Sequence, residues 1–440
     1  MRILLSPLLL FAACFLASGQ TAREALSARP ELAAGIYNMT REPFSEQTKA
    51  PKGYKPFYLS HYARHGARYM VSENYYTRLL KPLQAAHAAG RLTPLGDTLY
   101  ARASRYYAEH AQYRAGELTP VGWRQHKQIA GELLNCYPDV FRQAPLVHAV
   151  STQYHRCIMS MSAFCIGLKE KAPSLNIYEE ALRRTLPVMN PRDKSNPFPP
   201  HDIPDQAPWG QRPEEFAAQV VDADAIFGRI FSDTAFGASL VDPLRFSLWL
   251  YHHIYDAECD GTPYTLLDLP LLTADEAYAL WSVENLDCWY VSGLASRIYL
   301  PVLRDIVETA DDDLVADRPP VRLRFGHDTT IQALLTLMDA DGFGKVPAAP
   351  QDLADSWQNY RTPMASTLVF VFYRNPKRAD ADVLFKVLLD GKELSLPLTP
   401  VQGPYYRWED FRTYVRVLSD AQPDGQESVA ASLPVTASAS

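Results

Sequence analysis

The fold is decided at residues 57–69, which read Phe57-Tyr-Leu-Ser-His-Tyr-Ala-Arg64-His65-Gly66-Ala67-Arg68-Tyr69. Alternating β-forming residues lead into an abrupt turn in which a histidine stands between two arginines. This pattern predicts a strand that delivers reactive groups to the end of a sheet, which is where α/β proteins carry their chemistry.

The side chains of this turn suit a phosphoryl group. Two guanidinium groups offer forked donors for a tetrahedral oxyanion, and an imidazole is a competent nucleophile. We expect Gly66 to let the backbone approach the anion closely. Solvated charges on a surface turn would have the same sequence, so the interpretation needs support from other parts of the chain.

A second strand that ends in polar residues provides part of that support. A short apolar strand at 145–150 is followed by Ser151-Thr152-Gln153-Tyr154-His155-Arg156 and a helix to Phe164. We expect Arg156 to meet Arg64 and Arg68. His155 is either a ligand or an orienting or packed residue.

A third strand end carries Gly326-His327-Asp328-Thr329-Thr330, after a strand at 321–325 and before a helix to Leu337. Unpaired N–H groups and the dipole at a helix N-terminus favour an anion. Asp328 would also serve as a plain N-cap, but its neighbour His327 favours a role in a site. The pair His201-Asp202 lies among prolines with no strand before it and is assigned to a loop.

Composition sets limits on the class of protein. With 440 residues, 47% of them hydrophobic, the chain is expected to form two subdomains around a large core. The net charge of -7 argues against a nucleic-acid binder, although a few converging arginines still decide the local potential. The eleven histidines show no metal-ligand spacing, so we expect neither a metal nor a cofactor.

The N-terminus has the form of a targeting segment. Arg2 precedes an apolar run that is too short for a membrane span, which needs ~20 residues, and small residues follow before Gln20. We therefore expect export to the periplasm or the medium, with lipoprotein anchoring at Cys14 as the alternative. Of the five cysteines left after cleavage, Cys259 and Cys288 flank one helical region and are a candidate pair.

The expected fold is α/β, with a mixed, mostly parallel central sheet flanked by helices and an α-helical cap subdomain. Strands expected at 366–373 and 382–389, with a hairpin turn at Asp390-Gly391, extend the sheet in antiparallel fashion. Residues 20–54 are expected to be an extended lead-in. The expected division is a signal peptide at 1–19, a first α/β part at 20–175 with a helical excursion at about 75–135, a cap at 176–315, a second α/β part at 316–418 and a disordered tail at 419–440.

These residues together predict phosphoryl transfer. His65 would attack phosphorus in line, and Asp328 would protonate the leaving alcohol and later activate water. Arg64, Arg68, Arg156 and His327 would bind the equatorial oxygens, and losing one such donor should cost about 3 kcal/mol of barrier.

The three motifs resemble the histidine acid phosphatases, the branch of the phosphoglycerate-mutase-like superfamily that includes phytases, glucose-1-phosphatase and multiple inositol polyphosphate phosphatases. The resemblance covers most of the chain, from about Tyr54 to Tyr414. It implies His65 as nucleophile, Asp328 as proton donor, and phosphate ligands at Arg64, Arg68, Arg156 and His327.

Two positions depart from the family pattern. Met70 stands where the family usually has proline. Arg68-Tyr69 is similar to the inositol polyphosphate branch, which commonly has His-Ala-Glu, whereas this chain has His327-Asp328-Thr329, similar to bacterial phytases.

Our first hypothesis is an exported acid phosphomonoesterase that acts on a small-molecule phosphomonoester, with phytate or other inositol polyphosphates as leading substrates. Sugar phosphates or a broad substrate range are the alternative. A phosphoryl-transferring mutase and a non-catalytic binder of phosphorylated ligands complete the hypotheses. None of them requires a nucleic acid or a stable membrane span.

Overall fold

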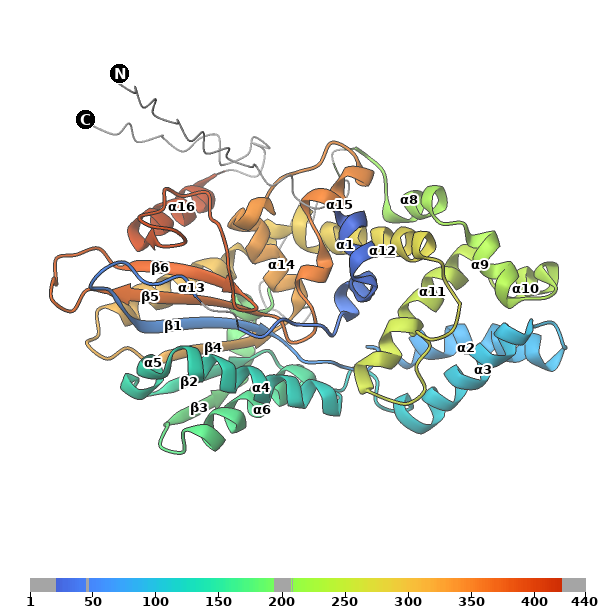
Figure 1. The fold of residues 1–440 in the computed structure, drawn as a ribbon, viewed down its shortest axis with the longest axis horizontal. Helices are drawn as coiled ribbons and strands as arrows, with labels where there is room; N and C mark the ends of the chain where they lie inside the picture. The colour runs from blue at the N-terminus through green and yellow to red at the C-terminus, as the bar shows by residue number, and fades with distance from the viewer. Residues whose placement is uncertain (1–20, 45–46, 194–206, 208, 422–440) are drawn as a thin grey trace, which may run out of the picture.

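The computed structural model describes residues 21–44, 47–193, 207 and 209–421. The expected signal peptide, the pair His201-Asp202 and nearly all of the expected tail lie outside these residues. Within them, an eight-stranded sheet has helices on both faces, and further helices stand beyond one end of the strands (Figure 1).

The sheet has a parallel half and an antiparallel half, as expected. Its order is β3-β2-β4-β1-β5-β6-β7, with β8 paired to β6. Neighbours from β3 to β1 are parallel, and β5 and the strands after it run antiparallel. The strands are β1 Lys55–Arg64, β2 Val147–Ser151, β3 Ile177–Glu180, β4 Val321–Gly326, β5 Thr367–Arg374, β6 Leu384–Leu389, β7 Lys392–Glu393 and β8 Tyr406–Arg407.

Strand β1 lies at the centre of the sheet because its residues are apolar on both faces. Tyr58 and Tyr62 belong to the core on one face, while Leu59 and Ala63 belong to the core on the other. This is the two-residue period of a strand that is covered on both sides. The strand that carries the reactive turn is therefore enclosed on both faces, and its last eight residues are all buried.

Each face of the sheet is covered by long helices (Figure 1). One of these helices begins directly after Thr119, because the Thr119 hydroxyl accepts a hydrogen bond from the Gly122 N–H at 3.2 Å. One face carries α4 Pro120–Cys136, α5 Pro138–Gln143 and α6 His155–Lys171; the other carries α13 Leu300–Leu314, α14 Asp328–Leu337 and α16 Trp408–Asp420.

The helices beyond the end of the sheet form a second core, and we call them the helical cap. Leu79 and Leu99 pack there with Ile226 and Phe246. The helical cap consists of α2 Glu73–Ala88, α3 Pro94–Tyr106, α9 Ala223–Ile230, α10 Thr234–Leu240, α11 Pro243–Asp256 and α12 Ala274–Trp289. Helix α8 Pro213–Val220 packs on α12, and its Phe216 and Ala217 belong to the core on the sheet side.

The helical cap is thus assembled from two separate stretches of chain, unlike the single insertion at 176–315 that we expected. Two elements inside that range belong to the α/β layer instead. Strand β3 is the edge strand of the sheet, and helix α13 packs against one face of the sheet. Helices α2 and α3, which precede that range, belong to the cap. Strand β3 was not predicted, and helical periodicity carries no information about which layer a helix joins.

The expectation of an extended lead-in is wrong. Residues Ala22–Ala28 form helix α1, and a 3₁₀ segment follows at Pro30–Tyr37. A capping box between Thr21 and Glu24 starts the helix. Leu26 and Leu32 are buried in the core of the helical cap, so the lead-in is packed structure.

Two smaller expectations have opposite outcomes. The hairpin turn is confirmed, since Asp390 and Gly391 both have positive φ, at 49° and 78°. The candidate cysteine pair is wrong, because Cys259 and Cys288 are both free thiols. Cys259 lies beside the Tyr37 carbonyl, whereas Cys288 accepts a weak contact from the Asn359 amide at 3.6 Å.

Candidate active site

Three strand ends meet at one edge of the sheet. In the parallel register Arg64 lies beside Gly326, and Ser151 lies beside Phe325. The His65 N–H donates to the Gly326 carbonyl at 2.9 Å, which continues the ladder one residue beyond β1. The three polar turns predicted from the sequence therefore emerge side by side, at the edge that faces the helical cap (Figure 1).

Arg64 is completely buried and is held at both ends of its guanidinium. Its Nη1 donates to the Thr362 carbonyl at 2.8 Å, and its Nη2 lies 3.2 Å from Oδ2 of Asp328. Nε and Nη2 nevertheless make no hydrogen bond. A buried cation with unused donors is costly unless an anion completes it.

His65 is buried and presents one defined nitrogen. Its Nδ1 lies 2.8 Å from the Gly66 carbonyl, which can only accept, so Nδ1 carries the proton and Nε2 keeps its lone pair. Burial, followed by the charge of Arg156, holds the pKa of His65 well below its ordinary value. The imidazole is therefore neutral in acid, as a nucleophile must be.

Arg68 and Arg156 complete the ring of cations. The Arg68 guanidinium lies 5.4 Å from the ring of Tyr37, and that of Arg156 lies 4.8 Å from the ring of Tyr154. Nε of each is buried without a hydrogen-bond partner. Together with Arg64, they supply several unused donors around His65.

The third turn brings His327 and Asp328 to the same place. The rings of His327 and His65 are 5.7 Å apart, and Asp328 begins helix α14. Burial and the charge of Arg156 lower the pKa of His327 to about 3, so this ring is a neutral donor. Burial alone would raise the pKa of the Asp328 carboxyl, but the charges of Arg64 and Arg68 outweigh it and hold that pKa below its ordinary value.

All six side chains expected at the site are thus brought together. We call them the phosphate cluster: Arg64, His65, Arg68, Arg156, His327 and Asp328. His155 is not one of them, because it lines a neighbouring cavity with Tyr69 and Trp123.

Gly66 has a different role from the one expected. A Cβ built on Gly66 would lie 2.5 Å from the carbonyl oxygen of Gly122 and 2.6 Å from its Cα. The space is therefore filled by the backbone of α4, and the Gly66 N–H donates to the Ser160 hydroxyl at 3.0 Å. Gly66 allows the catalytic turn to pack against α4 and α6, which fixes His65.

A second group of residues, which no sequence motif predicts, supports Arg68. The Met70 N–H donates to the Tyr76 hydroxyl at 2.9 Å, and this hydroxyl donates to Asp256 at 2.7 Å. Burial raises the pKa of Asp256 to about 6, and its charge faces Arg68. The turn is therefore tied to α2 and α11 of the helical cap. A proline at position 70 would have no N–H for this bond.

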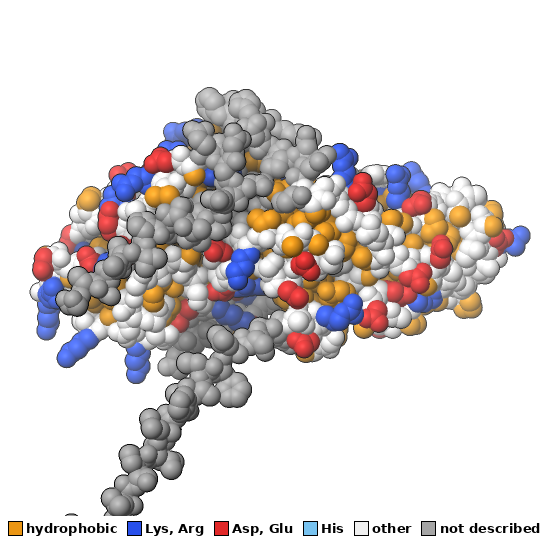
Figure 2. Space-filling view, turned by 90° about the horizontal axis from the view of Figure 1, so that it is seen from above, with side chains coloured by type: hydrophobic (Ala, Val, Ile, Leu, Met, Phe, Trp, Pro, Cys, Tyr) orange, Lys and Arg blue, Asp and Glu red, His pale blue; other side chains and the backbone are white. Residues whose placement is uncertain are grey.

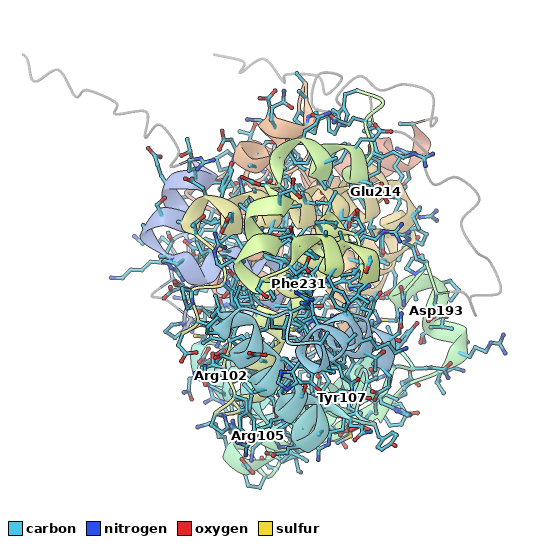
Figure 3. The ribbon with its side chains drawn as sticks, turned by 90° about the vertical axis from the view of Figure 1, so that its right-hand side faces the viewer. Arg102, Arg105, Tyr107, Asp193, Glu214 and Phe231 are labelled. Atoms are coloured by element: carbon cyan, nitrogen blue, oxygen red, sulfur yellow. The ribbon has the colours of Figure 1, made fainter. Side chains whose placement is uncertain are left out.

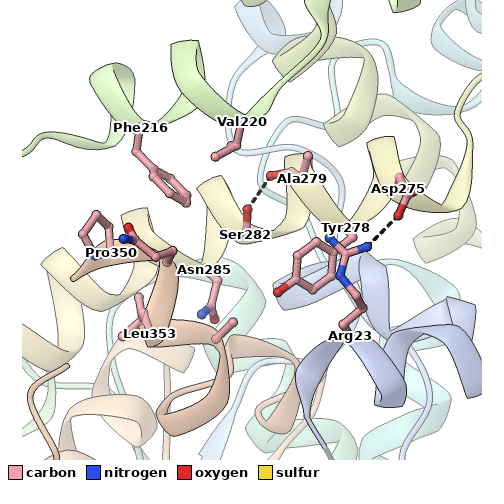
Figure 4. A pocket seen from close by; sticks show the side chains of 12 residues that line it. Arg23, Phe216, Val220, Asp275, Tyr278, Ala279, Ser282, Asn285, Pro350 and Leu353 are labelled. Atoms are coloured by element: carbon pink, nitrogen blue, oxygen red, sulfur yellow. Dashed lines mark hydrogen bonds and ion pairs between the residues drawn. The ribbon is translucent and has the colours of Figure 1, made fainter. Parts of the chain in front are cut away.

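Two cavities lie outside the phosphate cluster. One of about 580 Å³ lies beside the cluster, between the N-termini of α4 and α6. Another of about 270 Å³ lies between α1, α8 and α12, where Arg23 stacks on Tyr278 and pairs with Asp275 (Figure 4). Neither is lined by a residue of the phosphate cluster.

Charge on the visible surface is mixed. Seen from above, acidic and basic side chains alternate over the described residues, and neither sign forms a large field (Figure 2). On this face, the described residues therefore form no extended positive surface. Among the described residues, no group of three or more His, Cys, Asp or Glu side chains is placed to hold a metal ion.

The family of the chain is established by comparison with known proteins. A model of the histidine phosphatase superfamily (branch 2) matches residues 62–390. The chain therefore belongs to this superfamily. The matched region contains all six residues of the phosphate cluster.

Solved structures share the fold at low identity. A multiple inositol polyphosphate phosphatase of Bifidobacterium longum, in complex with inositol hexasulfate, has a TM-score of 0.71 at 18% identity, covering 87% of this chain and 97% of that one. A phytase of D. castellii has a TM-score of 0.64 at 13% identity, covering 89% and 85%. A phytase of Hafnia alvei has a TM-score of 0.56 at 15% identity, covering 84% and 98%. The search of curated proteins found no match.

Proposed function

We propose that this protein is an exported phosphomonoesterase that works through a phosphohistidine and acts on inositol polyphosphates. One observation carries the proposal: a neutral, buried His65 with a free Nε2 is surrounded by buried arginine nitrogens that make no hydrogen bond. Such an arrangement is stable with a tetrahedral anion in place and is otherwise costly.

The first step is attack by Nε2 of His65 on phosphorus. The bond from phosphorus to the ester oxygen breaks as the bond from nitrogen to phosphorus forms. Nδ1 keeps its proton, which it donates in a hydrogen bond to the Gly66 carbonyl. Arg64, Arg68 and Arg156 stabilise the equatorial oxygens as charge redistributes. These donors are fixed before the reaction, so little reorganisation is needed.

Asp328 supplies the proton for the leaving alcohol. Its pKa is held low by Arg64 and Arg68 in the free enzyme. A bound phosphate dianion offsets those two charges, so the carboxyl is able to hold a proton when the ester is in place. In the second step the ionised carboxylate takes a proton from the water that attacks the phosphohistidine, releasing inorganic phosphate and the free imidazole.

The substrate class is proposed from two lines of support. Arg68-Tyr69 is similar to the inositol polyphosphate branch of the family, and His327-Asp328-Thr329 to bacterial phytases. Solved relatives of the same fold include multiple inositol polyphosphate phosphatases and phytases. The first of these was solved in complex with inositol hexasulfate, a ring that carries several tetrahedral anions.

Export is proposed from the N-terminal sequence alone, with the short apolar run after Arg2 as its support. Within the described residues, the structure has no helix with the length and apolar character of a membrane span. Immunoblotting of culture fractions, with the processed N-terminus identified by mass spectrometry, tests this part of the proposal.

The catalytic proposal is tested with the variant His65→Ala and the matched control His87→Ala, since His87 is an exposed histidine on α2. Phosphate release at acid pH is measured from phytate, glucose 1-phosphate and an aryl phosphate. We expect His65→Ala to lose activity on every substrate and His87→Ala to retain it. Rapid quenching with labelled substrate should trap label on the wild-type chain. Equal turnover by His65→Ala and wild type would refute the mechanism.

A further inference from the structure

Arg78, on helix α2 of the helical cap, is a cation without an anion. No hydrogen bond or ion pair joins its guanidinium to any described residue, and its Nε is buried without a partner. Burial lowers its pKa. An arginine that is partly buried is normally paired with an anion, so the lack of an anionic partner for Arg78 requires an explanation.

Two aromatic side chains hold the guanidinium of Arg78 in a fixed place. Its Cζ lies 4.3 Å from the ring centre of Tyr75 and 5.0 Å from that of Trp249, on α2 and α11 respectively. Stacking of this kind orients the plane of the group while leaving its edge free to donate. The two terminal nitrogens are accessible, because only Nε is buried without a partner.

Tyr37 connects Arg78 to the phosphate cluster. Its ring lies 5.4 Å from the Arg68 guanidinium, and its phenol is close enough to Arg78 to offset part of the lowering of that arginine's pKa by burial. Glu284, a carboxylate whose charge acts on Tyr37, pairs with His252 at 2.9 Å. Arg78 thus stands one side chain beyond Arg68, with no carboxylate taking up its charge.

We propose that Arg78 is a second anion-binding position, which receives a neighbouring phosphate of a polyphosphorylated substrate while the reacting phosphate lies among Arg64, Arg68 and Arg156. The inference rests on the proposed function and refines it. In this proposal, one arginine of the helical cap causes the enzyme to prefer substrates that carry several phosphates. A substrate with a single phosphate gains nothing from this position.

The test compares two kinds of substrate in the variant Arg78→Met, which keeps apolar packing between the rings and removes the charge. The lost charge-assisted hydrogen bonds should lower kcat/KM for phytate about ten- to a hundredfold. Activity on an aryl phosphate should stay within about twofold, because that ester has no second phosphate. Arg78→Lys keeps the charge but not the fork, and should retain part of the phytate activity.

The matched control is Arg105→Met, which makes the same change in net charge. Arg105, on α3, also lies over a tyrosine ring, at 4.9 Å from Tyr264, but it is exposed and pairs with Glu109 at 3.3 Å (Figure 3). Its loss should leave both substrates unaffected. An equal effect of Arg105→Met and Arg78→Met would mean that the total charge of the cap matters, and would overturn the assignment.

Calorimetric binding of inositol hexasulfate and of orthophosphate provides a readout that needs no turnover. Arg78→Met should weaken hexasulfate binding about tenfold or more and leave orthophosphate binding unchanged. This separates the two proposals: absence of phosphate release by the wild type would refute the proposed function, while the hexasulfate measurement still decides the role of Arg78. Unchanged hexasulfate binding, or equal losses for both anions, would overturn the inference.

Discussion

Replacing Gly66 with alanine tests how the catalytic turn is held. The new Cβ would lie 2.5 Å from the Gly122 carbonyl oxygen, 2.6 Å from its Cα and 2.7 Å from its carbonyl carbon. Favourable contacts between heavy atoms lie at about 3.5–4.0 Å. The turn and α4 must therefore separate by roughly 1 Å, and both surfaces are backbone that cannot rotate away.

Two costs follow from this separation. Overpacking of this kind destabilises a protein by about 1–3 kcal/mol. The shift also strains the hydrogen bond from the Gly66 N–H to Ser160, and it moves the carbonyl that orients His65. Because a misplacement of about 1 Å costs on the order of a hundredfold in rate, kcat should fall by about that factor.

The assay combines the initial rate on an aryl phosphate with urea unfolding followed by circular dichroism. Gly228→Ala is the matched control, because its Cβ would meet only Thr234, at 3.9 Å, in the middle of α9. That variant should keep full activity and gain a few tenths of a kcal/mol or more from helix propensity. If Gly66→Ala retained wild-type kcat and stability, the packing of the turn against α4 would not be what positions His65.

Three further outcomes are expected. Burial lowers the pKa of His61, on β1, to about 3. As the pH falls below about 6.5, the unfolded chain binds a proton at this histidine and the folded chain does not, so the protein loses stability. His61→Leu should therefore reduce the stability lost between pH 7 and pH 5 by about 2 kcal/mol, measured by urea unfolding. Tyr76→Phe leaves the Met70 N–H without its acceptor and should cost about 1–3 kcal/mol and raise KM for an aryl phosphate; Tyr106→Phe, which loses only a 3.2 Å bond to Asp256, should cost less. Arg156→Gln removes the charge that most depresses the His65 pKa, so the acid limb of the kcat/KM profile should move to higher pH; a limb that stayed in place would show that another group sets it.

The sequence predicted the sheet side of the site well, because its signals are local. Each strand end carries its reactive residues within a few positions of the last β-forming residue, as at Arg64 and His65. In a parallel core such ends meet at one edge, so the convergence of Arg156 and His327 followed from the expected topology.

The cap side was not predictable in the same way. Tyr37, Asp256 and Arg78 approach the phosphate cluster from segments that are distant in sequence, and each is an ordinary residue of a short or amphipathic helix. Helix α1 has seven residues, too few to show a period. Only its capping box, Thr21 with Glu24, was a usable signal.

Gly66 shows a different limit of local reasoning. A glycine beside a reactive histidine is explained equally well by a bound anion and by a neighbouring backbone, and the choice depends on where α4 passes. Its partner Gly122 lies in the same predicted helix start as Thr119 and Pro120. The need for glycine at positions 66 and 122 is explained only when both are seen in the contact between the turn and α4.

His65, the proposed nucleophile, directly follows a strand that is hydrogen-bonded to a neighbouring strand along each of its two edges. The Arg64 amide donates to the Ser366 carbonyl at 2.8 Å, and the His65 amide to Gly326 at 2.9 Å. These two protons should exchange with solvent deuterium only through global unfolding, while amides of the helical cap exchange through smaller openings. We therefore expect the motions that admit a bulky ester to occur in the cap, while the backbone at His65 keeps its hydrogen bonds to the sheet.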